Sequence, residues 1–138
     1  MSNFDGTWGL YQWFPEHGEY LISSNDIERF KALLPNGKVF HCIAEDKDFL
    51  TLQYNEDMYH VKPMLYKKVS TPLFSFGKQV RVINHPERVG IVRGIEWHFK
   101  QNAVMYYLEI NGKFSSKRYW DQELSLINFD NKSHDVPI

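Results

Sequence analysis

The sequence predicts a mainly β protein made of two small closed sheets, with one short α-helix near the N-terminus. Helix signals are confined to residues 24–34, whereas short runs of alternating apolar and polar residues recur along the rest of the chain. Tight turns separate these runs, and Asn111-Gly112 is the strongest of the hairpin signals. Five short strands within residues 79–127 would leave costly free edges in a flat sheet, so we expect each set to close into a barrel.

The helix is expected over residues 24–34. Ser24 or Asn25 can cap its first turn, and the turn formers Pro35-Asn36-Gly37 end it. Its apolar positions recur at helical spacing and share one face: Ile27, Phe30, Leu33 and Leu34. This pattern is typical of a helix that lies across a sheet.

The strands are expected wherever apolar residues alternate between turn signals. In the first half they fall at residues 38–43, 49–54 and 58–62, and in the second half at 79–83, 89–95, 103–110, 113–119 and 124–127. His85-Pro86-Glu87 is expected to form one of the turns. Because an Asn-Gly hairpin turn requires it, we expect Gly112 to have a positive φ.

An internal repeat accounts for the two sets of strands. Residues 37–43 align with 77–83, residues 49–54 with 104–109, and residues 64–69 with 122–127. A small polar stretch with a proline interrupts the pattern at residues 69–72. We therefore expect two domains, residues 1–70 with the helix and the first barrel, and residues 71–138 with the second barrel and a polar tail.

Composition excludes several classes of protein. The 138 residues carry 16 Lys and Arg against 17 Asp and Glu, a net charge of −1, which lacks the basic footprint of a general nucleic-acid binder. No apolar run approaches the roughly 18 residues that span a bilayer, and no export signal is recognisable. Cys42 is the single cysteine, so no internal disulfide can form. These features favour a cytoplasmic protein.

Two stretches of the sequence resemble known families. Residues 76–82 and 89–95 resemble the first strands of SH3-like and Tudor-like small barrels, in which Gly-Lys precedes one strand and a Gly-x-Val strand follows a turn with proline. Residues 8–18, 96–100, 106–108 and 117–120 are similar to an uncharacterised family of small bacterial proteins, a domain of unknown function. The resemblance implies tandem small barrels and no known activity.

The first candidate binding segment is residues 8–18, which combine four aromatic residues with a proline, a glutamate and a histidine. Trp13 could stack on a ligand, with Trp8 or Phe14 as alternatives, and His17 or Glu16 could make polar contacts. The competing interpretation places these aromatic rings in the core and the Pro-Glu-His-Gly string in a turn.

The second candidate segment lies in the second barrel. Aromatic and basic residues gather there, namely Trp97, His98, Lys100, Arg118, Tyr119 and Trp120. Such a set could bind an extended peptide, a cationic group or a single-stranded nucleic acid. Alternation along residues 118–120 predicts that at least one ring points inward.

No motif indicates catalysis, a metal or a cofactor. The six histidines form no metal-binding pair, and His41 and Cys42, as neighbours on a strand, face opposite sides of a sheet. Cys42 therefore fits a small core residue. Phosphate-binding glycine motifs are absent from the sequence.

These observations favour a non-enzymatic binding or interaction module whose partner is a protein or peptide, without a membrane or a cofactor. Two alternatives remain open. One is a cytoplasmic immunity or toxin-antagonist protein, a class that is often small, mildly acidic and free of motifs. The other is weak RNA or DNA binding through Lys100, Lys113, Lys117 and Arg118, which would weaken steeply with salt.

Overall fold

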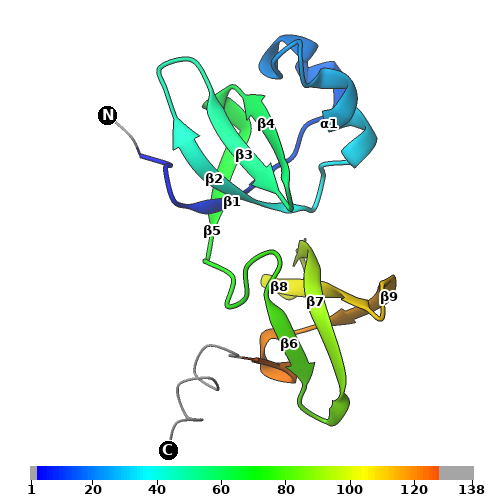
Figure 1. Cartoon of the computed structure of the whole chain (residues 1–138). Helices are drawn as coiled ribbons and strands as arrows, with labels where there is room; N and C mark the ends of the chain where they lie inside the picture. The colour runs from blue at the N-terminus through cyan, green and yellow to red at the C-terminus, as the bar shows by residue number, and fades with distance from the viewer. Residues whose placement is uncertain (1–2, 128–138) are drawn as a thin grey trace, which may run out of the picture.

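The computed structural model describes residues 3–127 and contains two five-stranded antiparallel sheets, one above the other (Figure 1). The first sheet has the strand order β4-β3-β2-β1-β5. Its strands are β1 (Trp8–Tyr11), β2 (Val39–Glu45), β3 (Leu50–Tyr54), β4 (Asp57–Val61) and β5 (Tyr66–Val69). We call this sheet and its connections the first unit.

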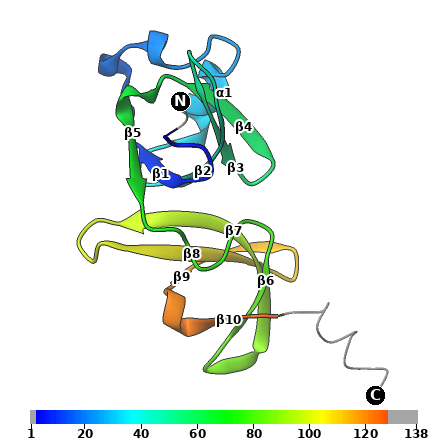
Figure 2. The ribbon, with the colours of Figure 1, turned by 90° about the vertical axis from the view of Figure 1, so that its left-hand side faces the viewer.

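The second sheet has the strand order β9-β8-β7-β6-β10. Its strands are β6 (Gln79–Val82), β7 (His85–His98), β8 (Ala103–Ile110), β9 (Lys113–Tyr119) and β10 (Leu124–Leu126). This second unit places the paired strands β7 and β8 directly beneath the first unit (Figure 2). The two sheets confirm the prediction of a mainly β protein.

Each unit repeats the same plan. Four strands follow one another across the sheet, a 3-10 helix comes next, and the fifth strand returns to pair with the first. The 3-10 helices are η3 (Pro63–Leu65) and η4 (Asp121–Glu123). By position in the sheet, β1 corresponds to β6 and β2 to β7, so the alignment of residues 37–43 with 77–83 paired the wrong strands. That alignment rested on the Gly-Lys pair that begins both segments. The strand β1 itself was not predicted.

Neither sheet is closed by the strand pairings among residues 3–127. In the first unit, β4 and β5 are the two edges, and in the second unit β9 and β10 are. The closed, SH3-like barrel therefore stays a prediction.

The first unit differs from the second by the segment between β1 and β2, which contains η1 (Pro15–His17), η2 (Glu19–Leu21) and the helix α1 (Ile27–Leu33). The helix lies beside the sheet at the far end of the first unit (Figure 1). Its Phe30 is fully buried, whereas Leu34 is 72% exposed. Leu34 follows the helix in a left-handed conformation and points away from the predicted apolar face.

The cap of the helix also differs from the prediction. Asp26 occupies the N-cap position instead of Ser24 or Asn25, and its side chain makes no cap hydrogen bond. The carboxylate instead accepts hydrogen bonds from Arg29 and His60, the latter on β4. A tertiary partner thus outweighs the local capping preference.

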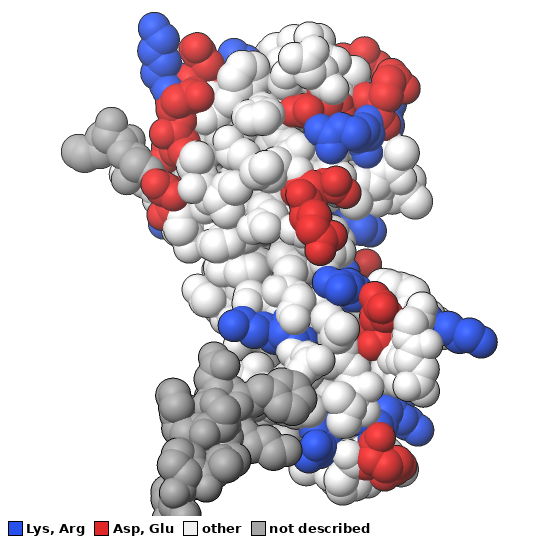
Figure 3. Space-filling view, viewed as in Figure 1, with Lys and Arg blue, Asp and Glu red and all other residues white. Residues whose placement is uncertain are grey.

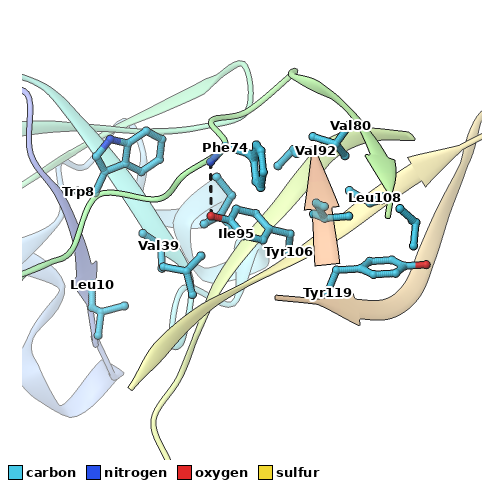
Figure 4. Packing of buried hydrophobic residues seen from close by; sticks show 13 residues of the cluster. Trp8, Leu10, Val39, Phe74, Val80, Val92, Ile95, Tyr106, Leu108 and Tyr119 are labelled. Atoms are coloured by element: carbon cyan, nitrogen blue, oxygen red, sulfur yellow. Dashed lines mark hydrogen bonds between the residues drawn. The ribbon is translucent and has the colours of Figure 1, made fainter. Parts of the chain in front are cut away.

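The two units share a hydrophobic core. Trp8, Leu10 and Val39 of the first unit pack in one cluster with Phe74, Ile95 and the interior of the second sheet (Figure 4). Polar contacts add to this packing, because the Ile95 N–H donates to the Tyr54 hydroxyl over 3.0 Å. The Trp97 N–H donates to the Gly37 carbonyl over 2.8 Å. A second cluster, built around Phe30 and Phe40, lies within the first unit.

The turns of the second unit are predicted in part. The turn between β6 and β7 lies at residues 83–84, two residues before the predicted turn, and His85, Pro86 and Glu87 belong to β7. Pro86 lies near the start of that strand, where a missing N–H costs little. Gly112 has φ +78°, as expected, and Asn111 has φ +53°.

We expect Gly112→Val to destabilise the protein by about 1–2 kcal/mol, because a β-branched residue strains a left-handed backbone. Open space surrounds the position, so the effect would come from the backbone and not from a clash. Urea unfolding followed by circular dichroism measures it, with Lys113→Val as the neighbouring control. Equal stabilities of wild type and Gly112→Val would contradict the assignment of the turn.

No helix among residues 3–127 is long and apolar enough to cross a membrane.

Candidate functional site

Three of the four aromatic residues of the N-terminal segment lie in the interior, namely Trp8, Tyr11 and Trp13, whereas Phe14 is 46% exposed. Trp13 is only 3% exposed, its indole N–H donates to the Gly18 carbonyl over 3.0 Å, and its ring contacts Phe30. Trp8 is 6% exposed and stacks on His41. Because these rings pack in the two cores, Trp13 offers no face to a ligand. The structure thus agrees with the interpretation that these rings belong to the core.

His17 has a local partner. It lies exposed on η1, and its Nδ1 accepts the N–H of Phe14 over 3.0 Å. The ring therefore supports the turn that the Pro-Glu-His-Gly string forms, and the structure does not bring it together with the candidates of the second unit.

The outer face of the second sheet carries a continuous row of side chains. Arg118 stands opposite Tyr107 in the β8–β9 register, and its guanidinium carbon lies 5.3 Å from the centre of the Trp120 ring. Trp120 contacts His98 edge-on at 5.4 Å. At the other end, Tyr107 stacks on Phe114 at 6.2 Å. We call His98, Trp120, Arg118, Tyr107 and Phe114 the aromatic–basic stripe.

Strand alternation puts these residues outside. Along β8, Val104, Tyr106 and Leu108 are buried, so the intervening Tyr107 points to the opposite face. The Tyr107 side chain lies over Gly94, where an added Cβ would come within 3.0 Å of the Tyr107 Cβ. A bulge follows Val92 at this point of β7. The same alternation buries Tyr119, which is 1% exposed, so this candidate belongs to the core.

The stripe has one cation without a carboxylate partner among the described residues, Arg118. The acidic residues on the neighbouring strands have other partners, because Glu109 binds Arg93 at 3.0 Å and Glu96 lies 3.6 Å from Lys38. Burial and the nearby Glu96 raise the pKa of Tyr107, and Arg118 partly offsets this. The Tyr107 hydroxyl is thus neutral at physiological pH. The face in Figure 3 carries interspersed charges of both signs, without a single-sign field.

A surface hollow of about 330 Å³ adjoins the stripe. Trp120 forms one wall, and the other lining residues are Gln101, Ala103, Val104, Asp121 and Gln122. Trp120 is half-buried, so part of its ring faces this hollow. Aromatic rings beside polar groups are typical of binding pockets, and this arrangement can hold a flat or apolar group against Trp120.

Trp97 lies elsewhere. It precedes His98 on β7, faces the opposite side of the sheet, and packs at the edge of the shared core. There it lines a groove between the two units, together with Leu10, Lys67, Lys68, Val69, Phe99 and Asn102. Lys100 lies exposed in the turn of the same hairpin. The predicted cluster thus divides into two surfaces, one with His98, Arg118 and Trp120, and one with Trp97.

Two members of the stripe were not among the predicted residues. Tyr107 follows Tyr106, and strict alternation along residues 103–110 would have placed it outside. Phe114 is 64% exposed at the start of β9, in a strand whose other residues are largely polar. A single apolar residue in a largely polar strand was the signal that could have indicated an exposed ring at Phe114.

The sequence also did not indicate the pair of Asp26 and His60. The Asp26 carboxylate is buried and accepts the His60 backbone N–H at 2.8 Å, and His60 Nδ1 lies 2.9 Å from it. No hydroxyl or thiol side chain within residues 3–127 hydrogen-bonds to the His60 ring. The pair joins α1 to β4, which is a structural role.

Cys42 lies in the interior of the first unit, as predicted for a core residue. Burial raises the pKa of its thiol to about 11, which keeps the thiol protonated and unreactive at neutral pH. Among the described residues, no three metal-binding side chains lie close enough together to hold an ion.

Of the comparisons with known proteins, one matches most of the chain. A protein-family model described as a family of unknown function (DUF6960) matches residues 1–125. No curated protein matches the chain.

Proposed function

Because the chain belongs to the family of unknown function DUF6960, no activity comes with its family, and we propose from the surface alone that it is a non-enzymatic binding module. The aromatic–basic stripe is the contact surface, and the partner is a protein or a peptide. The observation that carries this proposal is the unbroken contact from His98 through Trp120 to Arg118.

The composition of the stripe supports a macromolecular partner. Tryptophan, tyrosine and arginine are the residues most enriched among those that dominate binding energy at interfaces. Here Tyr107 and Arg118 lie on neighbouring strands, and Trp120 directly follows β9. Residues held by ordered backbone and by contacts with one another lose less side-chain entropy when a partner binds. Phe114 adds an exposed ring at one end, and the hollow beside Trp120 can receive one side chain of the partner.

A peptide library displayed on phage and selected on the wild-type protein tests the proposal. We expect the selected peptides to lose at least about tenfold in affinity on Trp120→Ala and on Arg118→Ala, which corresponds to about 1.4 kcal/mol or more. Fluorescence anisotropy of the labelled peptides measures the dissociation constants. Circular dichroism and thermal unfolding verify that both variants are folded.

Phe14→Ala is the matched control, because Phe14 is 46% exposed and lies outside the stripe. We expect it to bind the selected peptides as the wild type does. If the peptides bind Trp120→Ala and Arg118→Ala with unchanged affinity, or if the library yields no binder, the stripe is not the binding surface.

Single-stranded nucleic acid is the second candidate partner. Lys113, Lys117 and Arg118 all lie on β9, and Arg118 lies beside the Trp120 ring, on which a base could stack. This function predicts retention of a single-stranded oligonucleotide at low salt, and loss of it as salt increases. If the oligonucleotide is not retained at low salt, nucleic acid is excluded as the partner and the protein or peptide remains.

We also propose that each unit is an SH3-like small barrel. The shared strand order, the 3-10 helix before the fifth strand and the return of that strand to the first support this assignment. Small barrels of this kind have interiors filled with side chains, so recognition falls to their surfaces.

A further inference from the structure

We infer that the groove between the two units binds an extended acidic segment of a partner protein, which adds as a new strand to β5. The groove is lined by Leu10, Lys67, Lys68, Val69, Trp97, Phe99 and Asn102. This site is separate from the aromatic–basic stripe, so either of the two proposals can fail alone.

The first observation is the free edge of β5. This strand pairs with β1 through Tyr66, Lys67, Lys68 and Val69, and no other strand among residues 3–127 pairs with its second side. An unpaired edge presents backbone N–H and C=O groups that a further strand can satisfy. In Figure 2 the outer side of β5 is uncovered, and the tip of the β7–β8 hairpin projects below it.

The second observation is the apolar surface beside this edge. Phe99 is 55% exposed and Trp97 is half-buried, although both belong to a hairpin that could have carried polar residues. The groove has a volume of about 330 Å³. Lysines on an edge strand commonly protect it from pairing. Protection of the edge by lysines would not require exposed aromatic rings beside it. In strand addition, by contrast, apolar pockets beside the edge receive alternate side chains of the added strand.

The third observation is unbalanced positive charge. Lys67, Lys68 and Lys100 have no carboxylate partner among the described residues, and none of the residues that line the groove is acidic. Three other cations of the first unit, Arg29, Lys31 and Lys38, have carboxylate partners, such as Arg29 with Asp26 at 2.6 Å. Lys68 instead lies over the ring of Phe4. Carboxylates of a bound segment would complement these lysines.

A blocked seven-residue peptide of alternating glutamate and valine is the probe, titrated into the full chain labelled with nitrogen-15. We expect saturable NMR shifts of the amides of residues 66–69 and of the Trp97 indole. The double substitution Lys67→Glu and Lys68→Glu should weaken binding by about tenfold or more, and Phe99→Ala should also weaken it. Lys47→Glu, an exposed lysine on another loop, is the matched charge control and should leave binding unchanged.

Two further peptides separate strand addition from simple charge attraction. A lysine–valine peptide should not bind, and a glutamate peptide with prolines in place of valines should lose binding, since proline cannot donate to the ladder. Equal binding of the proline peptide would overturn strand addition. The Trp120→Ala variant should bind the glutamate–valine peptide as the wild type does; a loss there would place the acidic segment on the stripe and overturn this proposal.

Other occupants of the groove are also distinguishable. If removal of residues 128–138 shifts the same amides without any peptide, the C-terminal segment of the chain fills the groove. If the signals shift with protein concentration, a second copy fills it. Either result would overturn the proposal that an acidic segment of a partner protein occupies the groove.

Discussion

Phe30→Ala should destabilise the protein by about 3–5 kcal/mol, the typical cost of removing a fully buried aromatic side chain. Phe30 is the residue through which α1 is anchored, and it is 0% exposed. Its ring contacts the rings of Tyr11, Trp13, Phe40 and Tyr59. The substitution leaves a cavity among rigid rings that cannot collapse to fill it.

Urea unfolding at 25 °C measures this loss as a lower midpoint with an unchanged slope. Tyr20→Ala is the matched control, because Tyr20 belongs to the same insertion but is 69% exposed. We expect the control to change stability by less than about 0.5 kcal/mol. Comparable effects of the two substitutions would show that the helix is not anchored by Phe30.

Asp26→Asn should cost about 2–3 kcal/mol at pH 7, and this cost should shrink as the pH falls. Burial alone would raise the pKa of Asp26, but hydrogen bonds from the His60 backbone and side chain and from Arg29 outweigh it and lower the pKa. The ionised carboxylate therefore stabilises the fold above the ordinary Asp pKa of about 3.9. That contribution is lost as the pH falls through the lowered pKa of the folded state.

The measurement is the difference in unfolding free energy between wild type and Asp26→Asn, followed from pH 7 down to pH 2. Asp57→Asn, an exposed aspartate on β4, should show little difference at any of these pH values. A difference between wild type and Asp26→Asn that stays constant across the range would mean that the charge of Asp26 does not contribute.

Local patterns predicted most strands. Alternation identified β3, β8 and β9 with nearly correct limits, and the Asn111-Gly112 turn has the expected backbone. The strand β1 was missed because its four residues are buried on both faces and show no alternation. The helix was placed correctly, but its cap was not, since Asp26 is bound by a residue 34 positions away.

The candidate site was predicted less completely, for a related reason. Alternation places Tyr119 on the opposite face from its neighbours Arg118 and Trp120. It could also have identified Tyr107 as a residue of the outer face. It carries no information on which strand lies next to which, however. The approach of His98 to Trp120 joins two segments more than twenty residues apart, and burial of Trp13 depends on Phe30 from the inserted helix.

The sequence by itself determined the β class, most of the strands and, in regularly alternating strands such as β3 and β8, the inward or outward side of each residue, because these depend on neighbours in the chain. Only the tertiary structure decided that the two units share a core, that β5 keeps a free edge and that Trp97 and Trp120 serve different surfaces. Those outcomes depend on packing between distant segments, where buried area and hydrogen-bond partners, and not local preference, set the lowest free energy.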